Sequence, residues 1–454
     1  MSSIRWLTRT VFGLGWLVLP SAGRAAPEEV SGTQAPESHA AAAAAPVPPD
    51  KWTDSQGNYY RRAKTGHVTS YDEAAIGRYT LPEVLVLQSG IPVRDAETWR
   101  RERRPELLEL YRSQIYGRVP VNAPSVSFEV AEPAAPALDG LAIRKVIAVH
   151  FGDGGSGSVV MLHLYLPARA KEPVPVLLHL LFGKPPQLGE EGAPSSTAAK
   201  PSEVAPLADI LARGYGYAVY KYTELEPDNG AADATAGVRA LARAGSRSPR
   251  SGDDWGTISA WAWGASRMLD YLEKDPGVDA RRVALIGHSR LGKTVLWAGA
   301  QDERFALIYS SCAGEIGSSL ARRDYGETVD DMATNFSHQF APNFEAYIRH
   351  WDTLPVDAHC LLALQAPRPL FLTGGTLDQW ADPRGEFLAA VAAGPVYRLL
   401  GKTDLGTAEF PPPDTPVTTG ELAFYYHAGP HAITPSDWKV FLGFADRYLK
   451  PTPH

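Results

Sequence analysis

The sequence predicts an α/β fold, a three-layer αβα sandwich with a mostly parallel central sheet. Apolar runs of strand length recur along the chain and end at Gly or Pro, and the later runs alternate with helical patterns. Continuous apolar strands are typical of parallel sheets, because helices cover both faces of such sheets. With 454 residues, 44% hydrophobic and 21% charged, the chain has ample material for this core.

The N-terminus predicts export. Arg5 and Arg9 precede an apolar stretch at 11–19 and small residues at 21–26, the three parts of a bacterial secretory signal peptide over residues 1–26. The apolar stretch is shorter than the ~20 residues that span a bilayer, and no other long apolar stretch follows. We therefore expect a soluble protein that is periplasmic or secreted.

Two regions follow the signal. Residues 27–50 are rich in Ala, Pro and small polar residues, which bury too little apolar surface to offset the entropy of ordering, so we expect a flexible linker. From Lys51 onward aromatic and aliphatic residues occur at normal density without a fixed-period repeat, so we expect one domain over residues 51–454. The formal net charge of −7, with both signs interspersed, argues against nucleic acid as a partner.

Six apolar runs in this domain are predicted strands. They lie at residues 158–167, 174–183, 217–222, 282–287, 369–375 and 422–427. Two segments show the three- and four-residue spacing of amphipathic helices: the first contains Trp255, Ile258, Ala262, Met268, Leu269 and Leu272, and the second contains Trp438, Phe441, Phe444 and Tyr448. The second helix is expected to begin at Thr434, a residue type that caps helices, with Pro435 and Asp437 in its first turn.

Ser289 lies where the strand at 282–287 passes into a helical pattern. We match Gly287 and Gly292 to the outer glycines of the G-x-S-x-G pattern. A tight turn between strand and helix forms a nucleophile elbow, which projects the serine hydroxyl beside backbone N–H groups that can bind an oxyanion. The alternative is a serine that only caps the helix. The order of strand, turn and helix favours the nucleophile.

A serine nucleophile needs a histidine base and an acid that orients the base. For the base we choose His431, in the Gly-Pro loop before the terminal helix, over His427, which ends a strand and suits a structural role. For the acid we choose Asp378, which follows the strand at 369–375 closely, over Asp382, which precedes a proline and suits a turn. The resulting order of serine, acid and histidine is the one expected after a nucleophile elbow.

Four segments together resemble a known family. "GHSRLGKTVLWAGA", "YGETVDD", "LDQWADPRGEFL" and "GPHAITPSDW" occur in this order and are similar to segments of the glucuronoyl esterases, a family of carbohydrate esterases, and particularly of its bacterial members. The resemblance covers most of residues 51–454. It implies an α/β-hydrolase fold and a serine esterase whose substrate is the ester between (4-O-methyl-)glucuronic acid of glucuronoxylan and an alcohol of lignin.

The resemblance also implies roles for four further residues. Arg290 would stabilise the oxyanion through its backbone N–H and its guanidinium. Lys293 and Glu327 would bind sugar hydroxyls, and Trp380 would line the glucuronoyl site, where an indole offers apolar contact and an N–H donor. Positive charge is unfavourable at a helix N-terminus, so Arg290 and Lys293 need a reason other than helix stability.

The sequence departs from the fungal members of the family at the triad acid. Their glutamate corresponds here to Cys312, which cannot act as an orienting carboxylate, and the next acid, Glu315, stands three residues later. We therefore keep Asp378, an arrangement that some bacterial members imply, and leave open whether Glu315 assists. The fungal "GCSR" is "GHSR" here, so no disulfide is expected at the elbow. Whether Cys312 pairs with Cys360 stays open.

Two other functions stay open. One is a different carbohydrate esterase with the same triad, acting on acetyl xylan or on feruloyl esters, which would not need Lys293 or Glu327. The other is a noncatalytic glycan-binding protein on a hydrolase fold, against which the presence of Ser289, Asp378 and His431 argues. The histidines lack the spacing of metal ligands and no phosphate-binding Gly-rich loop occurs, so we expect no metal and no other cofactor. We expect a monomer that does not associate with membranes once the signal is removed.

Overall fold

The structure, a computed structural model, describes residues 50–152, 157–183, 204–230, 236–245 and 249–450. These residues belong to one compact unit. The expected signal peptide and linker, residues 1–26 and 27–50, lie outside the described residues apart from Asp50. Within the described ranges, no helix is long and apolar enough to cross a membrane.

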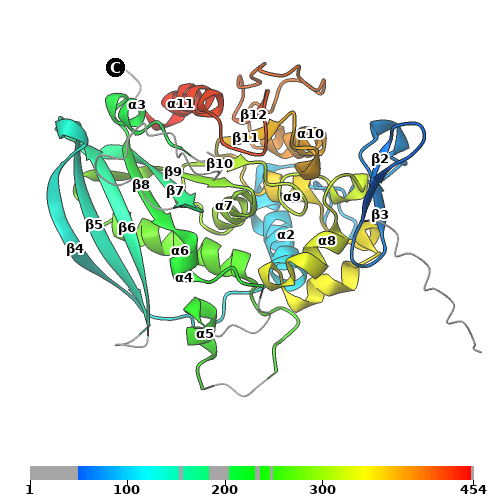
Figure 1. Cartoon of the computed structure of the whole chain (residues 1–454), viewed down its shortest axis with the longest axis horizontal. Coiled ribbons are helices and arrows are strands. Elements are labelled where there is room, and N and C mark those ends of the chain that lie inside the picture. Colours follow the sequence, from blue (N-terminus) through cyan, green and yellow to red (C-terminus); the bar gives the residue numbers. More distant parts are fainter. Residues whose placement is uncertain (1–49, 153–156, 184–203, 231–235, 246–248, 451–454) are drawn as a thin grey trace, which may run out of the picture. The chain divides into compact units, whose positions relative to one another are not determined.

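A nine-stranded sheet forms the centre of the described part of the chain (Figure 1). In order across the sheet its strands are β12 (Leu422–His427), β11 (Leu370–Gly375), β10 (Leu307–Ser311), β9 (Val278–His288), β7 (Val174–Leu181), β8 (Gly216–Lys221), β6 (Ser158–Pro167), β5 (Ala142–Phe151) and β4 (Val126–Ala137). The strands from β12 to β8 run parallel, whereas β6, β5 and β4 continue the sheet in antiparallel pairs. The prediction of a mostly parallel sheet is confirmed.

All six predicted strands are present, as β6, β7, β8, β9, β11 and β12, and their ends differ from the predicted ones by at most four residues. The sequence did not predict β4, β5 or β10. Strand β4 lies at the edge of the sheet, is mostly exposed and contains Pro133 and Pro136, so it lacks an apolar run. Strand β10 has only five residues, too few for a clear pattern.

Helices cover both faces of the sheet, as predicted, and each face has its own apolar cluster. One face carries α6 (Thr257–Leu272), α7 (Arg290–Gln301), α9 (Ala358–Ala363) and α10 (Pro383–Leu399), and the other carries α3 (Leu207–Ala212) and α11 (Pro435–Leu449). Figure 1 shows α6 and α7 on the side of the sheet opposite α11. Shorter helices are α1 (Ala96–Thr98), α2 (Arg104–Leu110), α4 (Tyr222–Leu225), α5 (Gly237–Arg243) and α8 (Val329–Asn335).

The terminal helix α11 begins where the sequence predicts. The Thr434 side chain accepts a hydrogen bond from the Asp437 backbone N–H, and the Asp437 carboxylate accepts from the Thr434 backbone N–H. This reciprocal capping box satisfies two backbone donors that the first helical turn leaves free. Pro435 costs nothing there, because its missing N–H would have had no helical partner. The cap fixes the end of the loop that contains His431.

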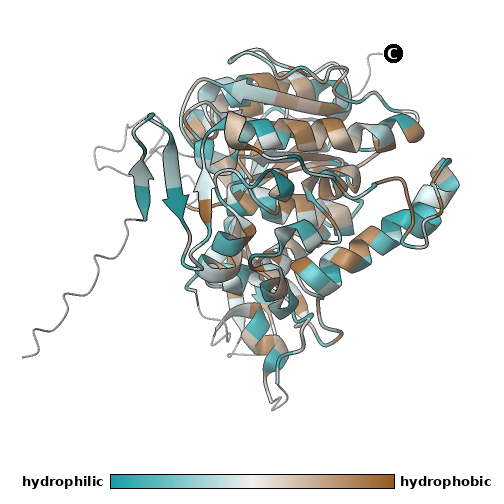
Figure 2. Cartoon of the chain, turned by 90° about the vertical axis from the view of Figure 1, so that its right-hand side faces the viewer, coloured by the Kyte–Doolittle hydropathy of each residue, from teal (hydrophilic) through white to brown (hydrophobic). Residues whose placement is uncertain are grey.

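A three-stranded antiparallel sheet, which the sequence did not predict, precedes the α/β core. It comprises β1 (Lys51–Thr53), β2 (Tyr59–Arg62) and β3 (Val68–Ser70). Figure 2 shows that these strands are largely hydrophilic, so they add little to the apolar core. A single bridge pairs Ser70 of β3 with Tyr325, which places this small sheet beside the loop that contains Glu327.

Candidate active site

Ser289 occupies a strained turn between β9 and α7. Its backbone has φ 58° and ψ −127°, a conformation that costs a residue with a side chain about 1–3 kcal/mol. The surroundings enforce it: the Ser289 N–H donates to the Ser311 carbonyl at 2.8 Å, and α7 starts directly at Arg290. Ser289 is partly exposed. The turn therefore presents the hydroxyl at the carboxyl end of the sheet, as a nucleophile elbow does.

The glycines around the serine fit the elbow, although the spacing differs from the pattern expected. Leu291 occupies the position of the second glycine in G-x-S-x-G, and Gly292 stands one residue later. A Cβ at Gly287 would lie 2.3 Å from the Leu291 carbonyl oxygen. A Cβ at Gly292 would lie 3.0 Å from the Ser310 Oγ and 3.0 Å from the Ser311 carbonyl oxygen, both of β10. Both glycines are thus needed for close packing of α7 on the sheet.

His431 and Asp378 lie together at the same end of the sheet as Ser289. The His431 Nδ1 and the Asp378 Oδ2 are 2.6 Å apart. The Asp378 side chain is only 3% exposed, whereas that of His431 is 38% exposed. If Nδ1 carries the proton and donates to the carboxylate, Nε2 is free to take a proton from a nucleophile.

The imidazole of His431 also packs near the elbow. Its ring centroid is 4.4 Å from that of His288, the residue before Ser289. No hydrogen bond between the Ser289 hydroxyl and His431 is present among the described contacts. Such bonds are often long in free enzymes and tighten when the substrate binds. The arrangement therefore places a serine hydroxyl, an imidazole and a carboxylate at one end of the sheet, and these are the groups that a nucleophile, a base and an acid require.

The rejected alternatives have structural partners. His427 is buried, and its two ring nitrogens lie 3.0 Å from the Asp437 carboxylate and 3.0 Å from the Pro430 carbonyl. Burial lowers the pKa of His427, but the hydrogen bond to Asp437 and its charge outweigh burial and raise the pKa overall. Asp382 caps α10 through the Gly385 N–H at 2.9 Å and pairs with Arg323 at 2.8 Å. Neither residue is free to serve the elbow.

Cys312, the residue that the sequence suggests for the slot of the fungal glutamate, directly follows β10. It is buried with φ 47°, and its N–H donates to the Thr373 carbonyl at 2.7 Å. Burial raises the pKa of its thiol well above the usual range, and the charge of Asp378 raises it further. Cys312 and Cys360 are both free, so the open question of a disulfide is settled against one. Cys312 is a neutral thiol beside the acid and the histidine.

Glu315 has a different environment from Asp378. Its side chain is buried, and its Oε1 has no hydrogen-bond partner among the described residues. Burial raises the pKa of the Glu315 carboxyl well above the usual range, and the nearby charges of Asp357 and Glu327 raise it further. A neutral carboxylic acid does not stabilise an imidazolium by charge. Its backbone N–H instead donates to the Glu327 Oε1 at 2.7 Å.

Arg290 is held by an acid that the sequence reasoning missed. Its guanidinium forms an ion pair with Asp228 and lies 5.4 Å from the centroid of the Phe336 ring. Asp228 also accepts hydrogen bonds from Tyr222 at 2.7 Å and contacts the His338 Nε2 at 2.6 Å. Burial raises the pKa of Asp228, but these partners outweigh it and lower the pKa below the usual range. The only sequence signal at Asp228 is its place in "EPDNG", which indicates a turn.

Lys293 and Glu327 form one buried ion pair. The Lys293 Nζ and the Glu327 Oε1 are 3.1 Å apart, and the two residues are 4% and 7% exposed. Glu327 is further fixed through its backbone, because its N–H donates to the Trp380 carbonyl at 2.8 Å. Trp380 is half-buried. The three residues expected to bind sugar are therefore linked to one another.

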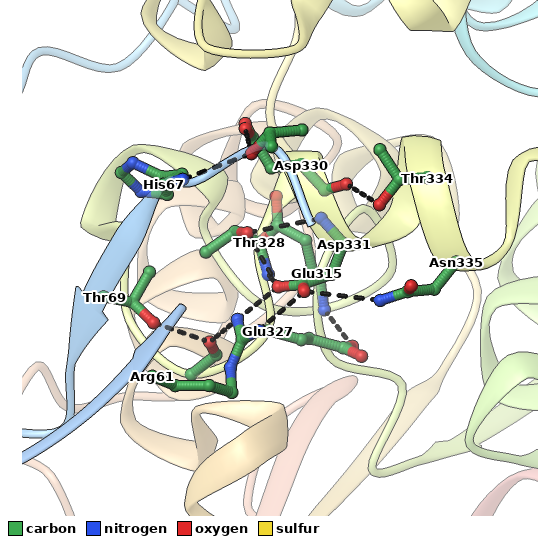
Figure 3. A network of polar contacts seen from close by, with 12 residues as sticks. Arg61, His67, Thr69, Glu315, Glu327, Thr328, Asp330, Asp331, Thr334 and Asn335 are labelled. Atoms are coloured by element: carbon green, nitrogen blue, oxygen red, sulfur yellow. Dashed lines mark hydrogen bonds and ion pairs between the residues drawn. The ribbon is translucent and has the colours of Figure 1, made fainter. Parts of the chain in front are cut away.

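Arg61 of β2 supports this group and was also missed from the sequence. Figure 3 shows its guanidinium turned toward Asp331, with which it forms a buried ion pair, and it also donates to the Gly326 carbonyl at 3.1 Å. The guanidinium lies 4.6 Å from the centroid of the Trp380 ring. The small antiparallel sheet thus fixes the loop that contains Glu327 and covers one face of Trp380. Arg61 is one of two adjacent arginines in "YYRR", and nothing in that segment gives a sequence signal for this role.

Comparisons with known proteins identify the family. The family model for fungal glucuronyl esterases matches residues 250–401. The chain is 39% identical to carbohydrate esterase MZ0003 from an unknown prokaryotic organism, over 84% of this chain and 92% of the relative. It is 36% identical to 4-O-methyl-glucuronoyl methylesterase 1 of Phanerochaete chrysosporium, over 34% of each chain. A solved glucuronoyl esterase from Solibacter usitatus is 41% identical, with a TM-score of 0.75 over 83% of this chain and 100% of the other.

The likeness extends beyond a shared architecture. A fold alone would not indicate an activity, since α/β-hydrolases support many reactions. Here an identity of 39% covers most of both chains, and a solved relative combines 41% identity with the same fold. The chain belongs to the glucuronoyl esterase family of carbohydrate esterases.

Proposed function

We propose that the protein hydrolyses the ester between the carboxyl group of (4-O-methyl-)glucuronic acid on glucuronoxylan and an alcohol of lignin, with Ser289, His431 and Asp378 as its triad. The observation that carries the proposal is the 2.6 Å contact between His431 and Asp378 at the end of the sheet where Ser289 occupies a strained turn. Relatives named glucuronoyl esterase and 4-O-methyl-glucuronoyl methylesterase support the uronate as the acyl group.

The first half of the reaction forms an acyl-enzyme. The His431 Nε2 takes the Ser289 proton while Oγ attacks the C6 carbonyl of the uronate. Backbone N–H groups at the start of α7 and the guanidinium of Arg290 stabilise the tetrahedral oxyanion. Asp378 stabilises the imidazolium that forms. The imidazolium then gives its proton to the departing alcohol as the C–O bond breaks.

The second half of the reaction releases the uronic acid. Water donates a proton to the His431 Nε2 and attacks the acyl carbon, and the same donors stabilise the second oxyanion. Collapse of this intermediate breaks the bond to Ser289, whose Oγ regains a proton from the imidazolium. Arg290 serves both steps without reorientation, because Asp228 and its partners hold the guanidinium in place.

Sugar recognition is assigned to Lys293, Glu327 and Trp380. An ammonium has three donors and a carboxylate has several acceptor sites. Lys293 and Glu327 can therefore hydrogen-bond to sugar hydroxyls while their own ion pair stays intact. The face of Trp380 that Arg61 leaves uncovered offers apolar contact to a pyranose ring. An acetyl or feruloyl esterase has no need of this pair, which favours the uronate ester over those substrates.

The proposal also covers location and assembly. Residues 1–26 act as a signal peptide and residues 27–50 as a linker, so the domain over residues 51–454 works outside the cytoplasm, where its polymeric substrate lies. The domain works as a monomer. N-terminal mass spectrometry of protein exported from a bacterial host tests the first part, with cleavage near residue 26 as the expected result. Light scattering tests the second part.

A panel of esters tests the reaction. We expect rapid hydrolysis of benzyl glucuronate and its 4-O-methyl form, slower hydrolysis of benzyl galacturonate, and little release from acetylated xylan or methyl ferulate. Ser289→Ala should reduce the rate by about 10⁴-fold or more with unchanged thermal unfolding, whereas Ser55→Ala, at an exposed turn, should keep the full rate. Preference for acetyl or feruloyl esters would reject the substrate, and full activity of Ser289→Ala would reject the mechanism.

A further inference from the structure

We propose that Cys312, Asp378 and His431 bind a thiophilic divalent cation such as Zn²⁺, and that the bound cation inhibits the esterase. The sulfur, one carboxylate oxygen and one ring nitrogen of these residues lie within 4.8 Å of one another. The inference rests on the proposed function, because two of its three ligands are the proposed base and acid. The thiol of Cys312 adds a third, soft ligand to them.

The three ligands are far apart in sequence and meet only in the fold. Each follows a strand of the parallel part of the sheet: Cys312 follows β10, Asp378 follows β11 and His431 follows β12. Neighbouring parallel strands end at the same edge, so residues just beyond them come together. The spacing rules for metal ligands along a chain do not detect such a group, so it could not be predicted from the sequence.

The donor set selects the class of cation. Zn²⁺ and Cd²⁺ accept thiolate, imidazole and carboxylate together, whereas Mg²⁺ and Ca²⁺ prefer oxygen ligands alone. Ligand distances of about 2.0–2.3 Å in a tetrahedral site place the ligand atoms roughly 3.5 Å apart. The 2.6 Å contact of His431 with Asp378 must therefore widen by about 1 Å, and the sulfur, which lies within 4.8 Å of both, must come to about 3.5 Å from them. The partial exposure of His431 leaves its ring room to move and gives the cation access.

Metal binding changes the proton balance of the site in a way that stops catalysis. The Cys312 thiol releases one proton to solvent and binds as thiolate. When the cation binds at Nδ1, the proton of the neutral His431 ring moves to Nε2, so the imidazole is held in a tautomer that cannot accept the Ser289 proton. The Asp378 oxygen then binds the cation in place of the N–H. Base and acid are thus both removed from the reaction while the fold stays intact.

Cys360 provides a matched control for Cys312. It is also a buried free cysteine, and its sulfur lies 3.5 Å from the Nε2 of His359. No group of three such ligands that includes Cys360 is present in the part of the chain that the structure describes. A soft cation should therefore distinguish the two cysteines, because among the described residues only Cys312 belongs to a group that holds a carboxylate as well as a histidine.

The first experiment measures metal binding by a readout that does not depend on esterase activity. Cd²⁺ is titrated into full-length Ser289→Ala protein, and the ultraviolet charge-transfer absorption of the thiolate–cadmium bond is followed. We expect saturation at one Cd²⁺ per chain, displacement by Zn²⁺ and no displacement by Mg²⁺. Adding Cys312→Ser should abolish the absorption, whereas adding Cys360→Ser should leave it unchanged. Adding His431→Ala should weaken binding by about tenfold or more. Because His431 is partly exposed, this variant tests the site without the risk that a change at the buried Cys312 disturbs the fold.

The second experiment measures inhibition in the active protein. Zn²⁺ should inhibit hydrolysis of benzyl glucuronate by the parent and by Cys360→Ser at the same concentration, and chelator should restore the rate. The inhibition of Cys312→Ser is measured relative to the rate of the same variant in chelator. The Zn²⁺ concentration that halves this rate should be about tenfold or more higher than for the parent.

Three results would overturn the metal site: equal Cd²⁺ affinity with and without Cys312, loss of the absorption in Cys360→Ser, or no saturable binding. Failure of the proposed function is distinguishable. If the protein binds Cd²⁺ through Cys312 but hydrolyses no uronate ester in the presence of chelator, the metal site stands and the proposed substrate is rejected. If it hydrolyses uronate esters but binds no Cd²⁺ through Cys312, the proposed function stands and the metal site is rejected.

Discussion

Replacing Asp378 by Asn tests which acid serves the catalytic histidine. The Asp378 carboxylate lies 2.6 Å from the His431 Nδ1 and its side chain is 3% exposed, so it is a desolvated counter-charge for the imidazolium. Asn keeps the shape but removes the charge. Its amide can also donate to Nδ1, which would leave the ring proton on Nε2, the tautomer that cannot act as a base.

We expect kcat for benzyl glucuronate to fall about 10⁴-fold, the loss that the same change causes in a serine protease triad. This corresponds to ~5.5 kcal/mol of transition-state stabilisation. KM should change little, because Asp378 contacts the base rather than the sugar. The free energy of unfolding should fall by only ~1.5–3 kcal/mol, the range for one hydrogen bond to a charged group. Steady-state kinetics and chemical denaturation of the same preparations measure both quantities.

Glu315→Gln is the matched control. Burial raises the pKa of the Glu315 carboxyl and so favours its neutral form, which Gln resembles in shape and charge, and kcat should stay within about threefold of the parent. If Glu315→Gln instead loses the 10⁴-fold and Asp378→Asn retains most activity, the assignment of the acid is wrong.

Three further variants test the surroundings of the site. Asp228→Asn should lower kcat by about 10²-fold with little change in KM, since the guanidinium of Arg290 loses its anchor, and steady-state kinetics measures this. Arg61→Met should lower the free energy of unfolding by ~3–5 kcal/mol in urea denaturation, since it leaves Asp331 buried without its partner. Burial raises the pKa of Glu386 from 4.5 to about 8, so unfolding free energy should decline as pH rises from about 4.5 through 8, and Glu386→Gln should flatten this decline.

Each of these expectations has a contrary result. A rise in KM alone for Asp228→Asn would place Arg290 in ground-state binding. Unchanged stability of Arg61→Met would show that the pair with Asp331 contributes nothing net. An identical pH profile for Glu386→Gln would show that this carboxyl is not neutral in the folded protein.

The apolar strands were predictable because burial on both faces leaves a continuous run that periodicity detects. The six runs in the sequence became β6, β7, β8, β9, β11 and β12, and the cap at Thr434 placed α11. Strand β4 was not predicted because an exposed edge strand tolerates proline and has no apolar run. The small antiparallel sheet was not predicted because its strands are three or four residues long and largely hydrophilic.

The placement of the proposed triad was predictable because its residues lie next to predicted strands. Ser289, Asp378 and His431 each follow such a strand closely, so the topology alone brings them to one edge. Asp228 and Arg61 had no comparable signal, because their roles arise from contacts with residues more than 60 positions away. The group formed by Cys312 with the acid and the histidine likewise exists only in three dimensions.

The most direct test of the account is covalent labelling of the nucleophile with a fluorophosphonate probe. Such a probe reacts with a serine only when a neighbouring base activates it. Mass spectrometry should locate a single adduct on Ser289, and His431→Ala should slow labelling at least about 10²-fold while the protein stays folded. An adduct on another serine, or equal labelling rates with and without His431, would contradict the triad.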